Sequence, residues 1–142
     1  MDTDAKGLIA VTQSSKHSIT LRTIPGRYGI AKLAQDAPVP GWSNGSGLSA
    51  VIRADDELTI VCLQERIPDG VTVEPNWRCL RSIGPFAFDA SGIVLSIISP
   101  LSSQGVGVFV ICTFDGEHIL VAEQHWEQSL LLLKEAGHLL ID

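Results

Sequence analysis

Residues 91–141 read SGIVLSIISPLSSQGVGVFVICTFDGEHILVAEQHWEQSLLLLKEAGHLLI, and this stretch decides the fold. Its apolar residues recur first at helical spacing, then in two short β-rich runs, then at helical spacing again. Another β-rich run comes just before it, interrupted at Gly84-Pro85. The predicted elements are a strand at 77–88, a helix at 91–104, strands at 106–113 and 117–122, a helix at 123–136 and a strand at 138–141. This order is the β-α-β-β-α-β unit of ferredoxin-like folds.

The first of these predicted helices has signals at both ends. Asp89 or Ser91 is expected to cap its N-terminus, because a side-chain oxygen there accepts hydrogen bonds from free N–H groups. Gly105 is expected to end it, since glycine readily adopts the left-handed conformation found after helices. Pro100 lies inside the helix, where it has no N–H to donate and should loosen the last turn.

The first half of the chain contains more strand and turn signals than helix signals. Strands are predicted at 17–24, 28–33, 48–54 and 58–63. Pro25-Gly26 is expected to turn the chain between the first two, with a short helix as the alternative for the second. Prolines, glycines and asparagine make 36–47 a loop with at most one helical turn, near Trp42, and 65–76 a connector.

Two local matches indicate that the halves are related. LRTIPG at 21–26 aligns with LRSIGP at 80–85, at an offset of 59, and DDELTIV at 55–61 aligns with DGEHILV at 115–121, at an offset of 60. A strand and a hairpin that recur at one spacing are typical of a duplicated unit.

No long amphipathic helix is predicted in the first copy, so the copies differ in completeness. We therefore predict an α+β fold of two tandem units, the first degenerate and helix-poor at 1–72, the second complete at 73–142. The poorly covered sheet of the first copy should obtain cover from its neighbour.

Composition restricts the partners and the compartment. The chain carries 10 basic and 16 acidic side chains, and 8 of the acidic against 3 of the basic ones fall in 74–142. This balance argues against nucleic acid or anionic lipid as the main partner. The three cysteines, Cys62, Cys79 and Cys112, lie in apolar stretches and are expected to be buried, reduced thiols. With no signal peptide or membrane helix in the pattern, a cytoplasmic protein is predicted.

Catalytic and metal-binding signals are weak. Adjacent residues of a strand point to opposite faces, so Glu117 and His118 do not form a site together. The four histidines are expected to have surface or structural roles. No catalytic residue, metal or cofactor is predicted. The start of the helix at 91–104 is more informative, because the N–H groups and positive dipole end of a helix bind carboxylates, and Gly92 permits close approach. Simple capping of that helix is the alternative. Asp115 is a candidate for an ammonium group, whereas a solvated turn is preferred for Glu117.

Residues 17–141 resemble the small ACT-domain proteins related to the CASTOR-type cytosolic arginine sensors. The motifs that carry the resemblance are Pro25-Gly26-Arg27-Tyr28, Pro38-x-Pro40-x-Trp42, residues 55–62, Trp77-Arg78-Cys79-Leu80, Gly84-Pro85-Phe86, Ser91-Gly92-Ile93, Pro100-Leu101 and Thr113-Phe114-Asp115. The resemblance implies tandem ACT-like units and a ligand between units. The ligand-binding residues that it implies are Phe88, Asp89, Ser91, Gly92, Ile93 and Val94 at the helix start, and Cys112, Thr113, Phe114 and Asp115 at the facing strand end.

Three functions remain open from the sequence. The first is a non-catalytic sensor that binds a small amino acid or similar zwitterion between ACT-like units. The second is an assembly module without a small ligand, for which the apolar surface at Leu130–Leu133 suggests a homodimer through the second unit, with core packing as the alternative. The third is an ACT-fold protein recruited as an enzyme of metabolite biosynthesis, with Asp115, His118 or Arg81 as acid–base candidates.

Overall fold

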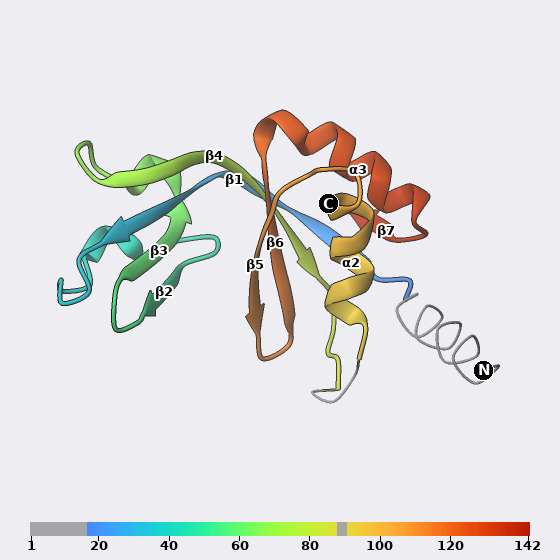
Figure 1. Cartoon of the computed structure of the whole chain (residues 1–142), viewed down its shortest axis with the longest axis horizontal. Helices are drawn as coiled ribbons and strands as arrows, with labels where there is room; N and C mark the ends of the chain where they lie inside the picture. Colours follow the sequence, from blue (N-terminus) through green and yellow to red (C-terminus); the bar gives the residue numbers. More distant parts are fainter. Residues whose placement is uncertain (1–16, 88–90) are drawn as a thin grey trace, which may run out of the picture. The chain divides into compact units, whose positions relative to one another are not determined.

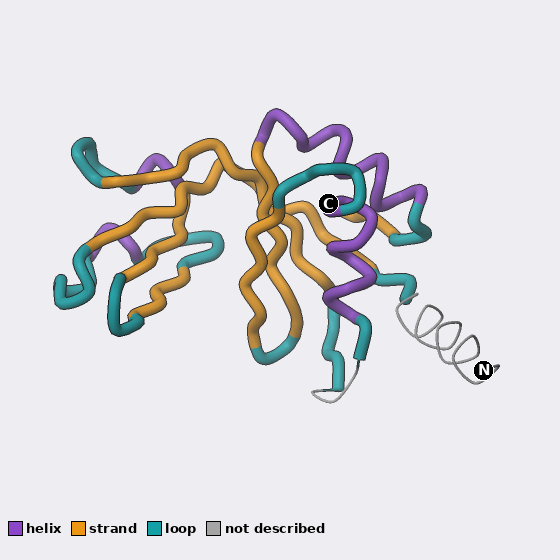
Figure 2. Tube along the Cα trace, in the orientation of Figure 1, coloured by secondary structure: helices purple, strands orange, loops and turns teal. Residues whose placement is uncertain are grey.

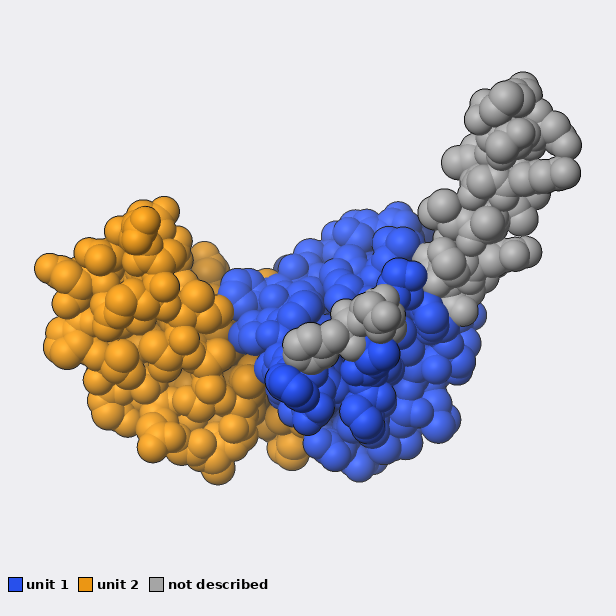
Figure 3. All heavy atoms as spheres, turned by 90° about the horizontal axis from the view of Figure 1, so that it is seen from below, with its two compact units in different colours: residues 1–23, 80–142 blue, residues 24–79 orange. Residues whose placement is uncertain are grey.

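The structure is a computed structural model that describes residues 17–87 and 91–142 (Figure 1). It is an α+β fold in which strands predominate and few helices occur (Figure 2). The chain divides into two compact units, one formed by residues 24–79 and the other by residues up to 23 together with 80–142 (Figure 3). We call them the middle unit and the terminal unit. Two long strands, β1 (Thr20–Leu33) and β4 (Thr72–Ser82), contribute one end to each unit.

The middle unit is a small sheet in the order β2-β3-β1-β4. Its elements are β1 (Thr20–Leu33), the 3-10 turn η1 (Gly41–Ser43), β2 (Ala50–Arg53), β3 (Leu58–Leu63), the 3-10 turn η2 (Gln64–Arg66) and β4 (Thr72–Ser82). The predicted hairpin is confirmed, because β2 and β3 pair antiparallel with Arg53 opposite Leu58. The single helical turn predicted near Trp42 is confirmed as η1.

The turn predicted at Pro25-Gly26 is wrong. The strands predicted at 17–24 and 28–33 are instead one continuous strand, β1. Gly26 has a φ of +96°, a conformation that costs glycine little, so the chain passes through this point without reversing. Pro25 is exposed there. The returning strand is β3, which pairs antiparallel with β1 from Tyr28 to Leu33.

The terminal unit contains the helices. From the end of β4 it continues with α2 (Ile93–Ser102), β5 (Val108–Thr113), β6 (Gly116–Ala122), the 3-10 turn η3 (Glu123–His125), α3 (Trp126–Glu135) and β7 (Leu139–Ile141). The β-α-β-β-α-β order predicted for this half is confirmed. Strand order is β7-β1-β4-β6-β5, so the start of β1 lies between the strands that end and begin this half.

One face of the terminal sheet is covered by α2 and α3, which pack on each other and on the sheet (Figure 1). The core beneath them consists mainly of aliphatic side chains from both helices and from alternate positions of the strands. Its members include Leu21, Leu80, Ile97, Leu101, Ile119, Val121 and Leu133. Leu131 is exposed, whereas Leu130 and Leu132 pack against the core, so the apolar surface of α3 is largely explained by core packing.

Helix α2 is shorter than predicted and begins differently. Its N-cap is Gly92, with φ +82°, and within residues 17–87 and 91–142 no side chain caps the helix. Ser91 is therefore not the cap, and Asp89 lies outside the described residues. The predicted stop is confirmed at Gly105, which has φ +80°.

Pro100 lies inside α2 as predicted, and His138 compensates for it. A proline at 100 cannot donate to the carbonyl of residue 96, four positions earlier. The Ser96 carbonyl instead accepts a hydrogen bond of 2.8 Å from Nε2 of His138. Nδ1 of the same ring accepts the Ile19 N–H at 3.1 Å. His138 is buried and joins α2 to the start of β1, which is a structural role.

No helix of the described residues is long and apolar enough to cross a membrane.

Candidate functional site

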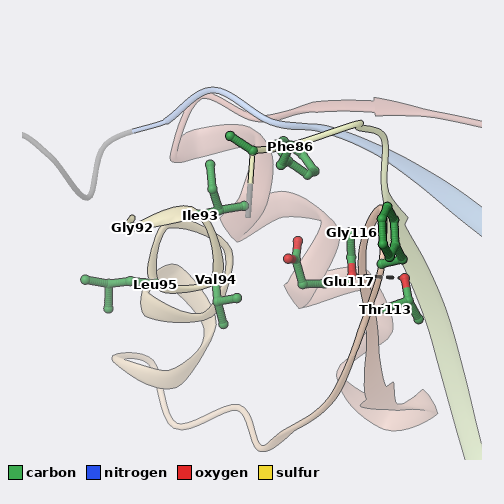
Figure 4. Close-up of a pocket in the computed structure, with 10 residues that line it drawn as sticks. Phe86, Gly92, Ile93, Val94, Leu95, Thr113, Gly116 and Glu117 are labelled. Carbon is green, nitrogen blue, oxygen red and sulfur yellow. Dashed lines mark hydrogen bonds between the residues drawn. The ribbon is translucent and has the colours of Figure 1, made fainter. Parts of the chain in front are cut away.

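A pocket of about 360 Å³ lies in the terminal unit between the first turn of α2, the β5–β6 hairpin and the segment after β4 (Figure 4). Helix, hairpin and connector each supply part of its wall. The lining residues are Phe86, Ala87, Gly92, Ile93, Val94, Leu95, Thr113, Phe114, Gly116 and Glu117. The wall is mixed, with apolar side chains around a few polar groups.

The helical side of the pocket is the first turn of α2. The first N–H groups of an α-helix have no partner in the hydrogen-bond ladder of the helix itself and lie at its positive end. Among the described residues no side chain caps them, and Gly92 at the N-cap adds no side chain of its own. Gly92, Ile93 and Val94 all line the pocket. This side can therefore accept a carboxylate.

The opposite side carries a nearly buried carboxylate, that of Glu117, which is 9% exposed. Ser82, at the end of β4, holds it: its hydroxyl donates to Oε1 of Glu117 at 2.9 Å and accepts the Glu117 N–H at 2.7 Å. In Figure 4 the carboxylate is directed toward the first turn of α2. Helix dipole and acid thus lie on opposite sides of one pocket, an arrangement that fits a molecule with an anionic and a cationic end.

Two glycines allow the end of β4 to contact the hairpin so closely. A Cβ at Gly84 would lie 2.5 Å from the carbonyl oxygen of Asp115, and one at Gly116 would lie 2.6 Å from Oγ of Ser82. Both distances are shorter than a carbon atom tolerates, so larger residues would force the two segments apart. The Thr113 hydroxyl donates to the Gly116 carbonyl at 3.1 Å and closes the turn (Figure 4).

The structure brings together half of the residues expected at the site. Those that line the pocket are Gly92, Ile93, Val94, Thr113 and Phe114. Phe88 and Asp89 lie outside the described residues. Ser91 lies beside the pocket rather than in its lining, and its carbonyl accepts a hydrogen bond from Nε2 of His17 at 2.9 Å.

The structure corrects three details of the strand end. Asp115, expected to hold an ammonium group in this pocket, is exposed and lines a different pocket. Glu117, expected in a solvated turn, is the carboxylate that lines this one. Cys112, expected to be buried, is exposed, whereas Cys62 and Cys79 are buried and all three are free thiols. Cys112 is exposed because it lies near the tip of β5, an edge strand.

Sequence reasoning missed five lining residues, Phe86, Ala87, Leu95, Gly116 and Glu117. A signal for Glu117 was present. Ile119 and Val121 belong to the core, and residues two and four positions earlier on a strand share their face, so Glu117 had to point toward the helices. The described residues contain no cluster of His, Cys, Asp or Glu side chains suited to a metal ion.

Comparison with known proteins agrees with this architecture. A family model of the ACT domain matches residues 72–135, and a model described as an N-terminal domain matches residues 26–70. A crystal structure of a protein from Agobacterium tumefaciens is 50% identical, with a TM-score of 0.85 over 88% of this chain and 93% of that one. The chain belongs to the same family as that protein. Its second half carries an ACT domain.

More distant structures share the fold of this ACT-domain protein. Aspartate kinase of Clostridium acetobutylicum is 14% identical, with a TM-score of 0.61 over 82% of this chain and 34% of that one. The regulatory subunit of aspartate kinase from Thermus flavus is 9% identical, with a TM-score of 0.55 over 84% and 97%. A search of curated proteins found no match. These two structures therefore show that the fold is shared.

Proposed function

We propose that this protein is a non-catalytic regulatory sensor that binds a small amino acid, or a similar zwitterion, in the pocket between α2 and the β5–β6 hairpin. The first turn of α2 would bind the carboxylate and Glu117 the ammonium group. We further propose that the chain comprises two tandem ACT-like units and that the helix-poor first copy has no such pocket.

The single observation that carries this proposal is the nearly buried Glu117 carboxylate opposite the start of α2, which no side chain of the described residues caps. A carboxylate removed from water is costly unless cations or hydrogen bonds compensate it. Ser82 donates to Oε1, which leaves the second oxygen of Glu117 for a ligand. A ligand ammonium group would supply the missing positive charge.

Pocket size supports a small metabolite. Ligand sites commonly occupy about 300–1,000 Å³, and this pocket, at about 360 Å³, is near the lower limit. The apolar side chains of Phe86, Ile93 and Val94 would contact the ligand's own side chain. A ligand of about 10 heavy atoms is expected to bind no tighter than micromolar, which suits an abundant metabolite. The resemblance to CASTOR-type sensors makes arginine the first candidate.

The test is calorimetry of the full chain against each standard amino acid, beginning with arginine. Binding of at least one amino acid is expected, about tenfold or more weaker in Glu117→Gln, because the variant loses a charge-assisted hydrogen bond. Asp115→Asn is the matched control: it removes one carboxylate from the same hairpin outside the pocket and should bind like the wild type. Absence of heat with every amino acid contradicts the proposal, as does equal weakening by both variants.

Assembly through the helical layer is a second candidate. Leu95 on α2 and Leu131 on α3 are 51% and 57% exposed, which is unusual for leucines on the covered side of a sheet. Sedimentation should then give a homodimer that Leu131→Glu dissociates. A wild-type monomer at micromolar concentration would contradict assembly and leave ligand binding unaffected.

A further inference from the structure

The repeated Leu-Arg segment supplies one arginine from each half of the chain. Leu21 and Leu80 occupy equivalent positions in LRTI and LRSI, and both are completely buried in the core of the terminal unit. Side chains alternate along a strand, so Arg22 and Arg81 point to the other face of the sheet, away from α2 and α3.

The register places these two arginines opposite each other. Strands β1 and β4 are neighbours and run in opposite directions (Figure 1). The Ile83 N–H donates to the Thr20 carbonyl at 2.9 Å, so Ile83 lies opposite Thr20. Arg22 is two residues after Thr20 and Arg81 is two residues before Ile83, which places the two arginines opposite each other. Like charges at directly opposed positions destabilise a sheet. An opposed arginine pair therefore calls for a compensating anion.

Both side chains line a second pocket of about 330 Å³, which shares no residue with the first. Its lining residues are Arg22, Arg81, Ser82, Ile83, Gly84, Pro85 and Asp115. Asp115 is the one acidic side chain in that set, against two arginines. Within the described part of the chain, neither guanidinium forms an ion pair with a carboxylate. This local excess of positive charge occurs in a chain of net charge −6.

His118 shows that both guanidinium charges act at one place. Nη1 of Arg81 lies 3.4 Å from Nε2 of this buried imidazole, and Nδ1 has no partner among the described residues. The pKa of His118 is lowered to about 4, by burial first and then by the charges of Arg81 and Arg22. The ring is thus neutral at pH 7 and compensates neither arginine.

We propose that Arg22 and Arg81 form a binding site for a small oxyanion, the phosphate or carboxylate group of a metabolite, separate from the amino-acid pocket. Each guanidinium presents a planar set of N–H donors that matches such groups in two-point contact. One arginine from each half would bind the same anion from the two sides.

The probes are sodium phosphate and sodium succinate, compared with sodium chloride at equal ionic strength. The readout is the NMR signal of the His118 ring in the full chain near neutral pH. We expect a saturable shift with an oxyanion and a raised His118 pKa in its presence, because a bound anion offsets the two guanidinium charges. Saturation by phosphate alone, or by succinate alone, identifies the chemical group.

Variants make the test specific. Arg22→Gln and Arg81→Gln should each weaken oxyanion binding by about tenfold or more. Lys32→Gln, the matched control, removes one exposed positive charge from the same strand β1 outside the pocket and should leave affinity within about twofold. Should a Gln variant fail to fold by circular dichroism, the corresponding Arg→Lys variant, which lacks the planar donors, is used with the same expectation of weaker binding.

An equal response to chloride, absence of saturation, or equal weakening in Lys32→Gln would overturn the proposal. Failure here is distinguishable from failure of the sensor proposal, since amino-acid binding is measured separately and uses other residues.

Discussion

The middle and terminal units differ most in their helices: the middle unit contains two short 3-10 turns, whereas the terminal unit contains two α-helices. The helical segments η1 and η2 of the middle unit have 3 residues each, whereas α2 and α3 have 10 each. Ordered strands therefore do not depend on full helices, whereas the pocket beside Glu117 is built in part from the first turn of α2.

Proline explains part of this difference. The segment before η1 contains Pro38 and Pro40, and Pro40 is the residue at its N-cap. Proline has no backbone N–H, so this segment has fewer free donors than the start of α2. The site at the start of α2 consequently has no counterpart in the middle unit, although the surrounding strands do.

The largest expected effect comes from truncating each core in turn. Leu101 in the terminal core and Ile60 in the middle core are both completely buried. Leu101→Ala should lower the free energy of unfolding by about 3 kcal/mol, and Ile60→Ala by about 2 kcal/mol because its core is smaller. Urea unfolding measures the loss, and hydrogen exchange shows where it occurs. Equal acceleration of exchange in both units by either variant would mean that they unfold as one.

A smaller effect, dependent on pH, should be confined to the terminal unit, because the middle unit contains no histidine. The pKa of His118 is lowered from 6.5 to about 4, mainly by burial, so the unfolded chain takes up a proton that the folded one does not. This contribution to stability is complete above about pH 6.5 and is lost as the pH falls toward 4.

Between about pH 7 and 5 the wild type should lose about 2 kcal/mol through this residue. His118→Leu should lose correspondingly less over the same interval, as measured by urea unfolding at each pH. An unchanged pH dependence in the variant would contradict this assignment.

The smallest effect separates backbone strain from ligand binding. Gly92 and Gly70 have φ values of +82° and +89°, one in each unit. Alanine at either position should cost about 1 kcal/mol of stability, because a Cβ disfavours the left-handed conformation. Only Gly92→Ala should also weaken amino-acid binding, since Gly92 lines the pocket. Calorimetry on the two variants decides this, and equal affinities would show that Gly92 serves the helix alone.

The spacing of apolar residues and the positions of turn-forming residues predicted most of the fold. Helical spacing placed α2 and α3, and the β5–β6 hairpin and Gly105 were found from alternation and from the glycine itself. The failure at Pro25-Gly26 has a physical cause: the same dipeptide can reverse a chain or pass through a strand, depending on whether the following residues find a partner. Tyr28 and its successors pair with β3, a distant segment that local signals do not reveal.

The site was predicted less completely, because its polar groups depend on contacts between distant residues. The helix start at Gly92 was visible in the sequence. Whether Asp115 or Glu117 lines the pocket depends on Ser82, which is 35 positions away from Glu117 in the sequence. The Ser82 hydroxyl donates a hydrogen bond to the Glu117 carboxylate and holds it in the pocket wall. Asp115 and Glu117 are both acidic residues at the tip of the β5–β6 hairpin, and the residues immediately beside them do not say which one faces the helices. The packing of the hairpin on β4 decides this.

The hydrogen bond between His138 and the Ser96 carbonyl has a consequence for how this family should vary. Pro100 cannot donate a hydrogen bond to that carbonyl, and His138 donates to it instead. A substitution of either residue alone would therefore disturb this arrangement. A chain with alanine at 100 regains an internal donor, which would compete with the imidazole for one acceptor. Positions 100 and 138 should therefore change in concert among homologues, as a compensated pair rather than as two independent sites.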